Sequence, residues 1–199
     1  MSQAPSILVL YFSRKGHTEA LARQIALGVE SAGATAVLRT VPPVSPVPEA
    51  TAPAVPDAGP PYAELEELAR CDGLIMGSPT RFGNMASALK HFLDTTSSHW
   101  LNGTLAGKPA AVFTTSSSLH GGQESTLLSM ALPLLHHGMI YVGVPYTEQA
   151  LFATRTGGSP YGATRITADW SEGFSDDEKA VAHSLGARVA TIAARLRST

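Results

Sequence analysis

The sequence predicts an α/β protein in which a doubly wound, five-stranded parallel sheet lies between two layers of helices. Residues 7–12 (ILVLYF) form a continuous apolar run, which is typical of a strand buried on both faces. Further apolar runs alternate with helical patterns along the chain, as expected for repeated strand–helix–strand units. Polar, glycine-containing loops follow three of these runs, at the edge where open α/β sheets bind ligands.

Bulk composition limits the possible classes of protein. The 199 residues suit a single domain, residues 1–199, that buries a sizeable core. The formal net charge is −2 and the 14 basic residues form no run, which argues against a nucleic-acid surface. Cys71 is the only cysteine, which excludes an internal disulfide. We find no signal peptide and no apolar stretch of membrane-spanning length, and therefore expect a cytoplasmic protein without membrane contact.

The first strand runs into a loop that has the parts of a phosphate site. Ser13 and Thr18 carry hydroxyls, Arg14 and Lys15 are cations, and Gly16 can take a positive φ. The next helix opens at this loop, so its backbone N–H groups and its dipole favour an anion there. An alternative stays open, in which the loop is only a strand-to-helix turn with Ser and Thr as caps.

The first half of the chain continues this alternation. Leu21, Ile25 and Val29 recur at helical spacing, and Gly33 ends the pattern. We then expect a strand at 36–41, a surface loop at 42–61 where eight of twenty residues are proline, a helix at 62–70, a strand at 72–77, a polar loop at 78–84, and a helix whose face carries Met85, Leu89, Phe92 and Leu93.

The second half supplies two more strands. We expect a strand at 110–114, a loop at 115–122 (TSSSLHGG), a helix at 124–137 that contains Pro133, and a strand at 140–144. Residues 145–173 are too many for an ordinary connector. Ser175 and Glu178 form a capping box before a last helix, whose face carries Val181, Leu185, Val189, Ile192 and Leu196. The simplest strand order is 2-1-3-4-5, which gathers the loops after strands one, three and four around one cleft.

The loop after the third strand adds a cation and an aromatic ring. Arg81 and Phe82 precede Gly83, so a planar ligand could lie against this loop, although Phe82 could equally be a core residue. Together with the phosphate loop, these residues suggest a flat ring system with a phosphate tail. The seven histidines show no metal-ligand spacing, and we expect no metal.

Several short sequence motifs then indicate a resemblance to a known family. The sequence resembles the WrbA family of flavodoxin-like NAD(P)H:quinone oxidoreductases from about residue 7 to residue 166, in LVLYFS, GSPTRFGNM, FLD, GGQE, HHGM and PYGAT. Lys15 stands where this family commonly has an aromatic residue, and the loop 115–122 is longer than usual.

The resemblance implies a flavodoxin-like fold, a non-covalently bound FMN and a homotetramer. It implies a ping-pong reaction in which NADH or NADPH reduces the flavin and the flavin reduces a quinone. The implied cofactor-binding residues are Ser13, Arg14, Lys15, Gly16, His17, Thr18, Pro79, Thr80, Arg81, Phe82, Gly83, Asn84, Thr115, Ser116, Ser117, Ser118, Leu119, His120, Gly121 and His136.

Two of these residues and a tryptophan have further implied roles. His136 matches the family's active-site histidine, and with Arg81 it would stabilise negative charge during the reaction. Without the resemblance, a histidine near a helix end is more typical of a structural residue. Trp100 and Phe82 would border the substrate.

Two other functions compete with the reductase. A flavodoxin-type electron carrier has the same fold, but such carriers are generally strongly acidic, whereas this chain has a net charge of −2. A non-enzymatic binding protein finds no basic or coiled-coil feature in the sequence. The physiological quinone and the choice between NADH and NADPH stay open.

Overall fold

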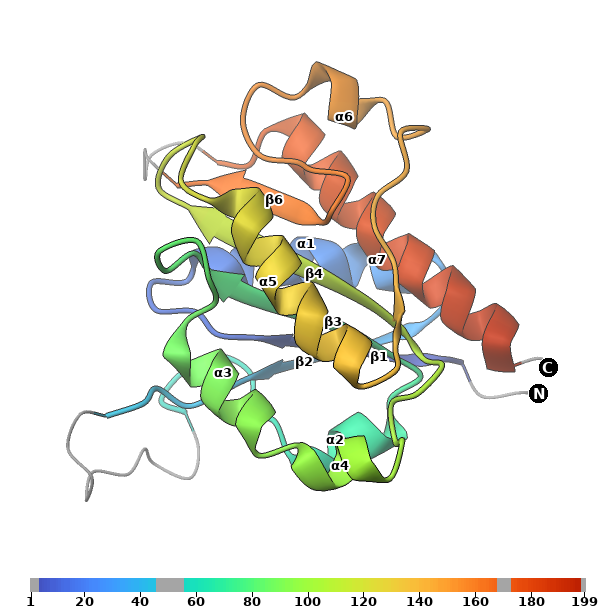
Figure 1. Ribbon diagram of the computed structural model, residues 1–199. Helices are drawn as coiled ribbons and strands as arrows, with labels where there is room; N and C mark the ends of the chain where they lie inside the picture. Colours follow the sequence, from blue (N-terminus) through green and yellow to red (C-terminus); the bar gives the residue numbers. More distant parts are fainter. Residues whose placement is uncertain (1–3, 46–55, 168–172, 198–199) are drawn as a thin grey trace.

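The computed structural model describes residues 4–45, 56–167 and 173–197. Its sheet follows the order β2-β1-β3-β4-β5 with parallel pairing throughout, which confirms the predicted order (Figure 1). The strands are β1 (Ser6–Tyr11), β2 (Thr35–Thr40), β3 (Gly73–Pro79), β4 (Pro109–Ser116), β5 (Ile140–Tyr141) and β6 (Ala163–Ile166).

Helices cover both faces of this sheet and complete a three-layer architecture. One face carries α1 (His17–Ser31) and α7 (Asp176–Arg197). The opposite face carries α2 (Leu65–Arg70), α3 (Ser87–Asp94) and α5 (Gln123–His136). Two short helices, α4 (Ser97–Leu101) and α6 (Ala150–Ala153), lie in the connections, and neither was expected from the sequence. No described helix has the length and apolar content needed to cross a membrane.

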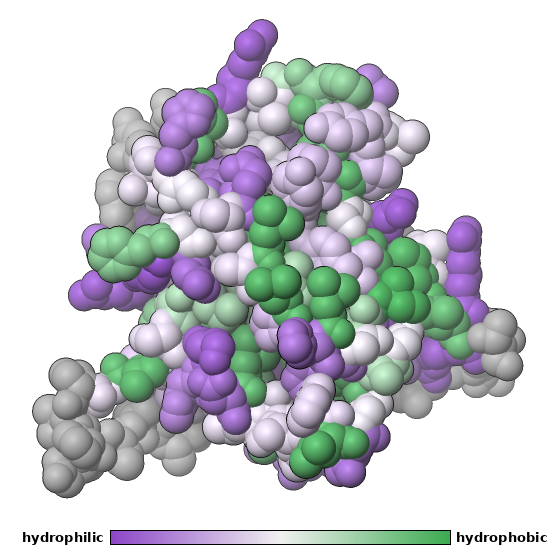
Figure 2. Space-filling model, viewed as in Figure 1, coloured by the Kyte–Doolittle hydropathy of each residue, from purple (hydrophilic) through white to green (hydrophobic). Residues whose placement is uncertain are grey.

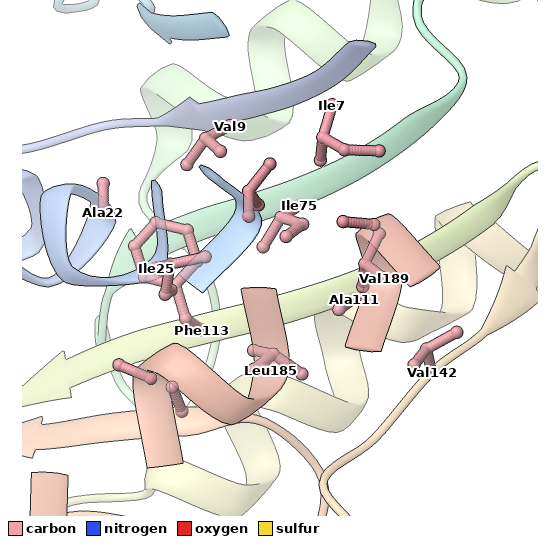
Figure 3. Close-up of a cluster of buried hydrophobic side chains, with 14 of the residues drawn as sticks. Ile7, Val9, Ala22, Ile25, Ile75, Ala111, Phe113, Val142, Leu185 and Val189 are labelled. Atoms are coloured by element: carbon pink, nitrogen blue, oxygen red, sulfur yellow. The ribbon is translucent and has the colours of Figure 1, made fainter. Parts of the chain in front are cut away.

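The core explains why the first strand reads as a continuous apolar run. Ile7, Val9 and Tyr11 point to the cluster beneath α1 and α7, whereas Leu8 and Leu10 point to the cluster on the other face. Successive strand residues alternate between faces, so a strand covered on both sides needs apolar residues at every position. Figure 3 shows the first of these clusters, in which side chains of the sheet meet those of α1 and α7.

The backbones of α1 and α7 approach each other at two glycines. A Cβ atom on Gly28 would lie 2.2 Å from the carbonyl oxygen of His183, and one on Gly186 would lie 2.2 Å from that of Ile25. Real Cβ atoms do not come this close to backbone atoms, so both positions require glycine. The backbones of the two helices therefore contact each other directly at these two positions.

The fifth strand position differs from the prediction. Only Ile140–Tyr141 pairs with β4, at the start of that strand, whereas the sequence predicted a strand over 140–144. The end of β4 pairs instead with β6, which lies within the long region 145–173 and makes the sheet six-stranded. Val144 leaves the sheet because its N–H bonds the carbonyl of Pro160 at 2.9 Å. The segment 142–162 therefore separates β5 from β6, two short strands that pair with the two ends of the same strand, β4.

Other differences concern the ends of elements. The helix expected at 62–70 begins at Leu65, after a capping box between Glu64 and Glu67. β3 and β4 each continue two residues further than expected, because Pro79 still pairs with Thr115, and Ser116 pairs with Ile166 of β6. The capping box of α7 is confirmed, with reciprocal bonds of 3.1 Å between Ser175 and Glu178. Residues 46–55 of the proline-rich loop lie outside the described residues.

Candidate functional site

A cavity of about 680 Å³ opens at the carboxyl edge of the sheet. Its walls are the loops after β1, β3 and β4, which were expected to surround one cleft. From the predicted cofactor-binding set, the structure brings together Ser13, Arg14, Lys15, His17, Thr18, Pro79, Thr80, Arg81, Phe82, Thr115, Ser116, Ser117 and Gly121. Gly16, Gly83, Asn84, Ser118, Leu119 and His120 belong to the same loops.

The turn at residues 13–18 is not closed by side-chain caps. Gly16 occupies the N-cap position of α1 with φ of 84°, so the N-cap residue has no side chain that could accept a hydrogen bond from the first helical N–H groups. The hydroxyl of Ser13 is buried and has no hydrogen-bond partner among the described residues. The hydroxyl of Thr18 lies against Thr115 instead, at 3.1 Å. These donors fit a phosphate group, and the capping alternative is wrong for this turn.

His17 carries its imidazole in this turn close to positive charge. Burial, followed by the positive charges of Arg165 and Lys15, lowers the pKa of His17 below its ordinary value. Cationic groups disfavour a further positive charge close to them, which favours the neutral imidazole. The positive character of the turn therefore comes from the basic side chains and from the start of α1.

The loop after β3 holds Phe82 in an unusual backbone conformation. The backbones of Arg81 and Asn84 exchange two hydrogen bonds, of 2.8 and 3.0 Å, around Phe82 and Gly83. Both central residues have positive φ, 52° and 74°, which is the pattern of a type I′ turn. A positive φ in a bulky residue costs on the order of 1 kcal/mol. The Phe82 side chain is fully exposed, so it is not a core residue.

Threonine hydroxyls connect the loop after β3 to β4 and to α5. Thr80 Oγ1 lies 3.3 Å from Thr114 Oγ1 and accepts a hydrogen bond of 3.2 Å from Thr126 Oγ1 of α5. Thr114 also donates to the carbonyl of Ser78 at 2.7 Å. Thr114 and Thr126 are fully buried and were not among the predicted site residues. The bonds fix the loop after β3 relative to β4 and α5.

The loop after β4 is held by a second buried network. Gln123 is 3% exposed, and its Nε2 donates to Ser116 Oγ at 2.7 Å. Its Oε1 accepts from Thr164 Oγ1 of β6, also at 2.7 Å. Ser116 Oγ in turn donates to the carbonyl of Ser118 at 2.8 Å, and its own carbonyl accepts from Thr167 Oγ1 at 3.0 Å. Gln123, Thr164 and Thr167 were missed from the sequence, although Gln123 stands in the GGQE phrase.

Trp100 and His136 lie together, but not at this cavity. They line a second cavity of about 580 Å³ that is bordered by residues of α3, α4 and α5. His136 ends α5, whose first residue adjoins the cleft loop, and a 14-residue helix is about 20 Å long. A single chain therefore does not bring His136 or Trp100 to the cleft.

The residue after His136, which is His137, also lines the second cavity. His137 Nε2 lies 3.0 Å from Thr96 Oγ1. Burial, followed by the charges of His99 and His136, lowers the pKa of His137. The environment therefore disfavours a positive charge on this side chain, which contacts Thr96 at the start of α4, the helix that carries Trp100.

The chain was compared with known proteins. The family model described as NADPH-dependent FMN reductase matches residues 5–153. The chain is 46% identical to NAD(P)H dehydrogenase (quinone) of Trichlorobacter lovleyi, over 96% of this chain and 98% of that protein. It is 45% identical to NAD(P)H dehydrogenase (quinone) of Gluconacetobacter diazotrophicus, with the same coverage of both chains.

Solved structures share the fold at lower sequence identity. A flavodoxin, WrbA-like protein from Agrobacterium tumefaciens superposes with a TM-score of 0.71 at 24% identity, over 96% of this chain and 99% of that chain. Oxidised flavodoxin 1 from Bacillus cereus gives a TM-score of 0.61 at 17% identity, over 94% and 97%. These likenesses confirm the flavodoxin-like fold. The match over residues 5–153, together with relatives at 45–46% identity over nearly the whole chain, shows that this protein belongs to the NADPH-dependent FMN reductase family.

Proposed function

We propose that this protein catalyses the two-electron reduction of quinones by NADH or NADPH, with FMN bound in the cleft of the carboxyl edge. Family membership and two relatives named NAD(P)H dehydrogenase (quinone) support this activity. The observation that carries the proposal is the uncapped start of α1 beside the unpartnered Ser13 hydroxyl. These groups suit a flavin phosphate, and the exposed aromatic ring of Phe82 rims the same cavity.

The two ends of the cleft have different roles in this proposal. Ser13, Thr18 and the first N–H groups of α1 bind the phosphate, and the loop after β4 lines the ring and its ribityl chain. Bound FMN supplies the redox chemistry, by accepting a hydride equivalent from NAD(P)H and passing two electrons to a quinone. Phe82 offers a flat apolar surface beside the substrate. Arg81, whose guanidinium bonds the Thr80 carbonyl at 2.8 Å, stabilises negative charge at the reacting rings.

A homotetramer is part of the proposal, because the outer face of α5 is apolar. Leu128, Leu132 and Leu135 are 46–60% exposed along this helix, and Figure 2 shows apolar side chains gathered there. A second copy of the chain would bury this face. The candidate FMN cleft of the same chain lies at the other end of α5 from His136 and Trp100. If these two side chains act on the quinone, they must therefore do so at the cleft of a neighbouring copy.

A cytoplasmic location also belongs to the proposal. Burial raises the pKa of the Cys71 thiol to about 11, and the thiol donates to the Leu68 carbonyl. A buried thiol of this kind is inert and packs as a small apolar group. Cys71 is therefore a packing residue, as expected in a compartment where thiols stay reduced.

Steady-state kinetics test the reductase. The full chain, loaded with FMN, is assayed with NADPH or NADH and benzoquinone, beside the apoprotein as control. We expect parallel double-reciprocal lines, because one flavin face cannot hold nicotinamide and quinone together. Full FMN occupancy without quinone turnover would replace the reductase by an electron carrier. Absence of FMN binding would contradict the cofactor assignment itself.

A further inference from the structure

Arg165 of β6 lies at the same edge of the sheet as the turn at residues 13–18 (the phosphate turn), although it is far from that turn in the sequence. It pairs in register with Thr115 of β4. Partners in register on adjacent strands send their side chains to the same face of the sheet. Thr115 Oγ1 lies 3.1 Å from Thr18 Oγ1, in the first turn of α1. The Arg165 side chain therefore leaves the sheet on the α1 side, at the end where α1 begins.

The neighbours of Arg165 in β6 support this placement. Ala163 belongs to the core cluster beneath α1 and α7, whereas Thr164 bonds Gln123 of α5 on the opposite face. Strand residues alternate between faces, so Arg165 shares the face of Ala163. Its guanidinium carbon lies 3.9 Å from the centroid of the Phe174 ring, which holds the planar group by a cation–π contact.

This cation is buried, and its charge reaches the phosphate turn. Arg165 is only 9% exposed, and a guanidinium keeps its proton at every physiological pH. Its charge and that of Lys15 both act on His17, the first residue of α1. Glu19, the acidic residue of the same helical turn, is engaged with Arg23 at 2.6 Å. Two positive charges, one in the loop and one buried in the sheet layer, therefore act on the start of α1.

We propose that Arg165 is a specificity residue for the flavin phosphate, whose buried positive charge makes the protein select FMN over riboflavin. The inference rests on the proposed function, because it assigns the phosphate of FMN to the turn at residues 13–18. A buried charge is screened less by salt than an exposed one, so the contribution of Arg165 to anion binding persists when salt screens Arg14 and Lys15 at the cavity wall. Without Arg165, the turn would bind the phosphate through its N–H groups, its hydroxyls and these two exposed cations.

Flavin titration of the apoprotein tests this role through quenching of flavin fluorescence. Arg165→Gln removes the charge. Arg165→Met also removes it but keeps an unbranched stem against Phe174, so the test does not depend on one variant folding. Arg165→Lys keeps the charge, and Arg155→Gln makes the same neutralising change at an exposed arginine of the segment 142–162.

The expected result separates phosphate recognition from packing. Both neutral variants should bind FMN about tenfold to a hundredfold more weakly, with riboflavin affinity unchanged. Arg165→Lys should lose less FMN affinity than either, and Arg155→Gln none. Equal losses for the two flavins, or unchanged FMN affinity in the neutral variants, overturn the inference alone. A wild-type protein that binds neither flavin contradicts the proposed function, and the inference with it.

Discussion

The hydroxyl of Thr18 at the start of α1 lies 3.1 Å from the hydroxyl of Thr115 near the end of β4. The two residues are 97 positions apart, and both are at most 4% exposed. This bond joins the phosphate turn to the loop that borders the rest of the cleft. Besides the pairing of the strands, this pair of threonines therefore helps to fix the relative position of the two ends of the candidate FMN site.

Removing this bond should weaken the fold and the cofactor site together. Thr18→Val and Thr115→Val keep the side-chain volume, and each should lower the free energy of unfolding by about 1 kcal/mol. The double variant should lose less than the sum of the two, because both single changes break the same bond. Urea unfolding of the three variants checks the non-additivity. Strict additivity would show that the hydroxyl pair is not an interaction.

Phe82 should trade stability for activity. Asparagine adopts positive φ more readily than phenylalanine, so Phe82→Asn should leave the free energy of unfolding equal or raise it by about 0.5–1 kcal/mol. The same change removes the aromatic surface and should lower kcat/KM for quinones. Leu101→Asn, at another exposed apolar residue, is the control and should leave kinetics unchanged. Full activity in Phe82→Asn would remove the substrate role of this ring.

Glu178 should be important for stability, because its buried carboxylate holds three segments. It accepts backbone N–H bonds from Ser175 and Gly157, both at 3.1 Å, and from Ile166 at 3.3 Å. Glu178→Ala leaves these donors buried and should cost about 2–3 kcal/mol in thermal or urea unfolding. Asp176→Ala, which removes an exposed ion pair with Lys179, should change little. Equal effects of the two changes would contradict the anchoring role.

Stability should fall with acidity through His137. Its pKa is lowered in the folded protein, so below the ordinary histidine pKa of 6.5 the unfolded chain binds a proton that the folded chain does not. The free energy of unfolding should therefore decrease as the pH falls from neutral to about 5.5. His137→Gln should flatten this decrease, whereas His91→Gln, at an exposed histidine, should not. If the free energy of unfolding of His137→Gln keeps the wild-type dependence on pH, another group causes the effect.

The apolar face of α5 should control assembly. Leu132→Glu places a charge in the middle of this face and should convert the proposed tetramer to smaller species in light scattering. FMN affinity should persist, because the lining of the cleft comes from one chain. Leu27→Glu, at a similarly exposed leucine of α1, should leave assembly intact. A wild-type monomer at micromolar concentration would rule out the tetramer.

Sequence reasoning succeeded where a local pattern has one physical cause. The run at residues 7–12 is typical of a strand covered on both faces, which β1 confirms for residues 7–11, and its loop could be placed at a ligand-binding edge. The run at 140–144 was misread because burial and pairing have the same signature. Val142 and Val144 are buried, yet they lie outside β5.

The parts of the site that sequence reasoning missed depend on distant contacts. Thr164 supports the cleft loops through Gln123, and Arg165 lies at the same edge of the sheet, because β6 pairs with the end of β4. No periodicity in residues 145–173 predicts that strand. His136 and Trp100 were expected to border the cofactor and the substrate, but within one chain they line a different cavity. Helix length decides this separation, and it became visible only once the ends of α5 were known.

The glycine contacts between α1 and α7 bear on how the protein is made. Chains leave the ribosome from the amino end, and domains fold as their segments emerge. The helix that opens at the phosphate turn is synthesised early, but the close backbone contacts at Ile25 and Gly28 are made with α7, the last described helix. Until α7 emerges, α1 has an uncovered apolar side. A nascent chain stalled before residue 176 would therefore expose apolar surface of the kind that chaperones bind.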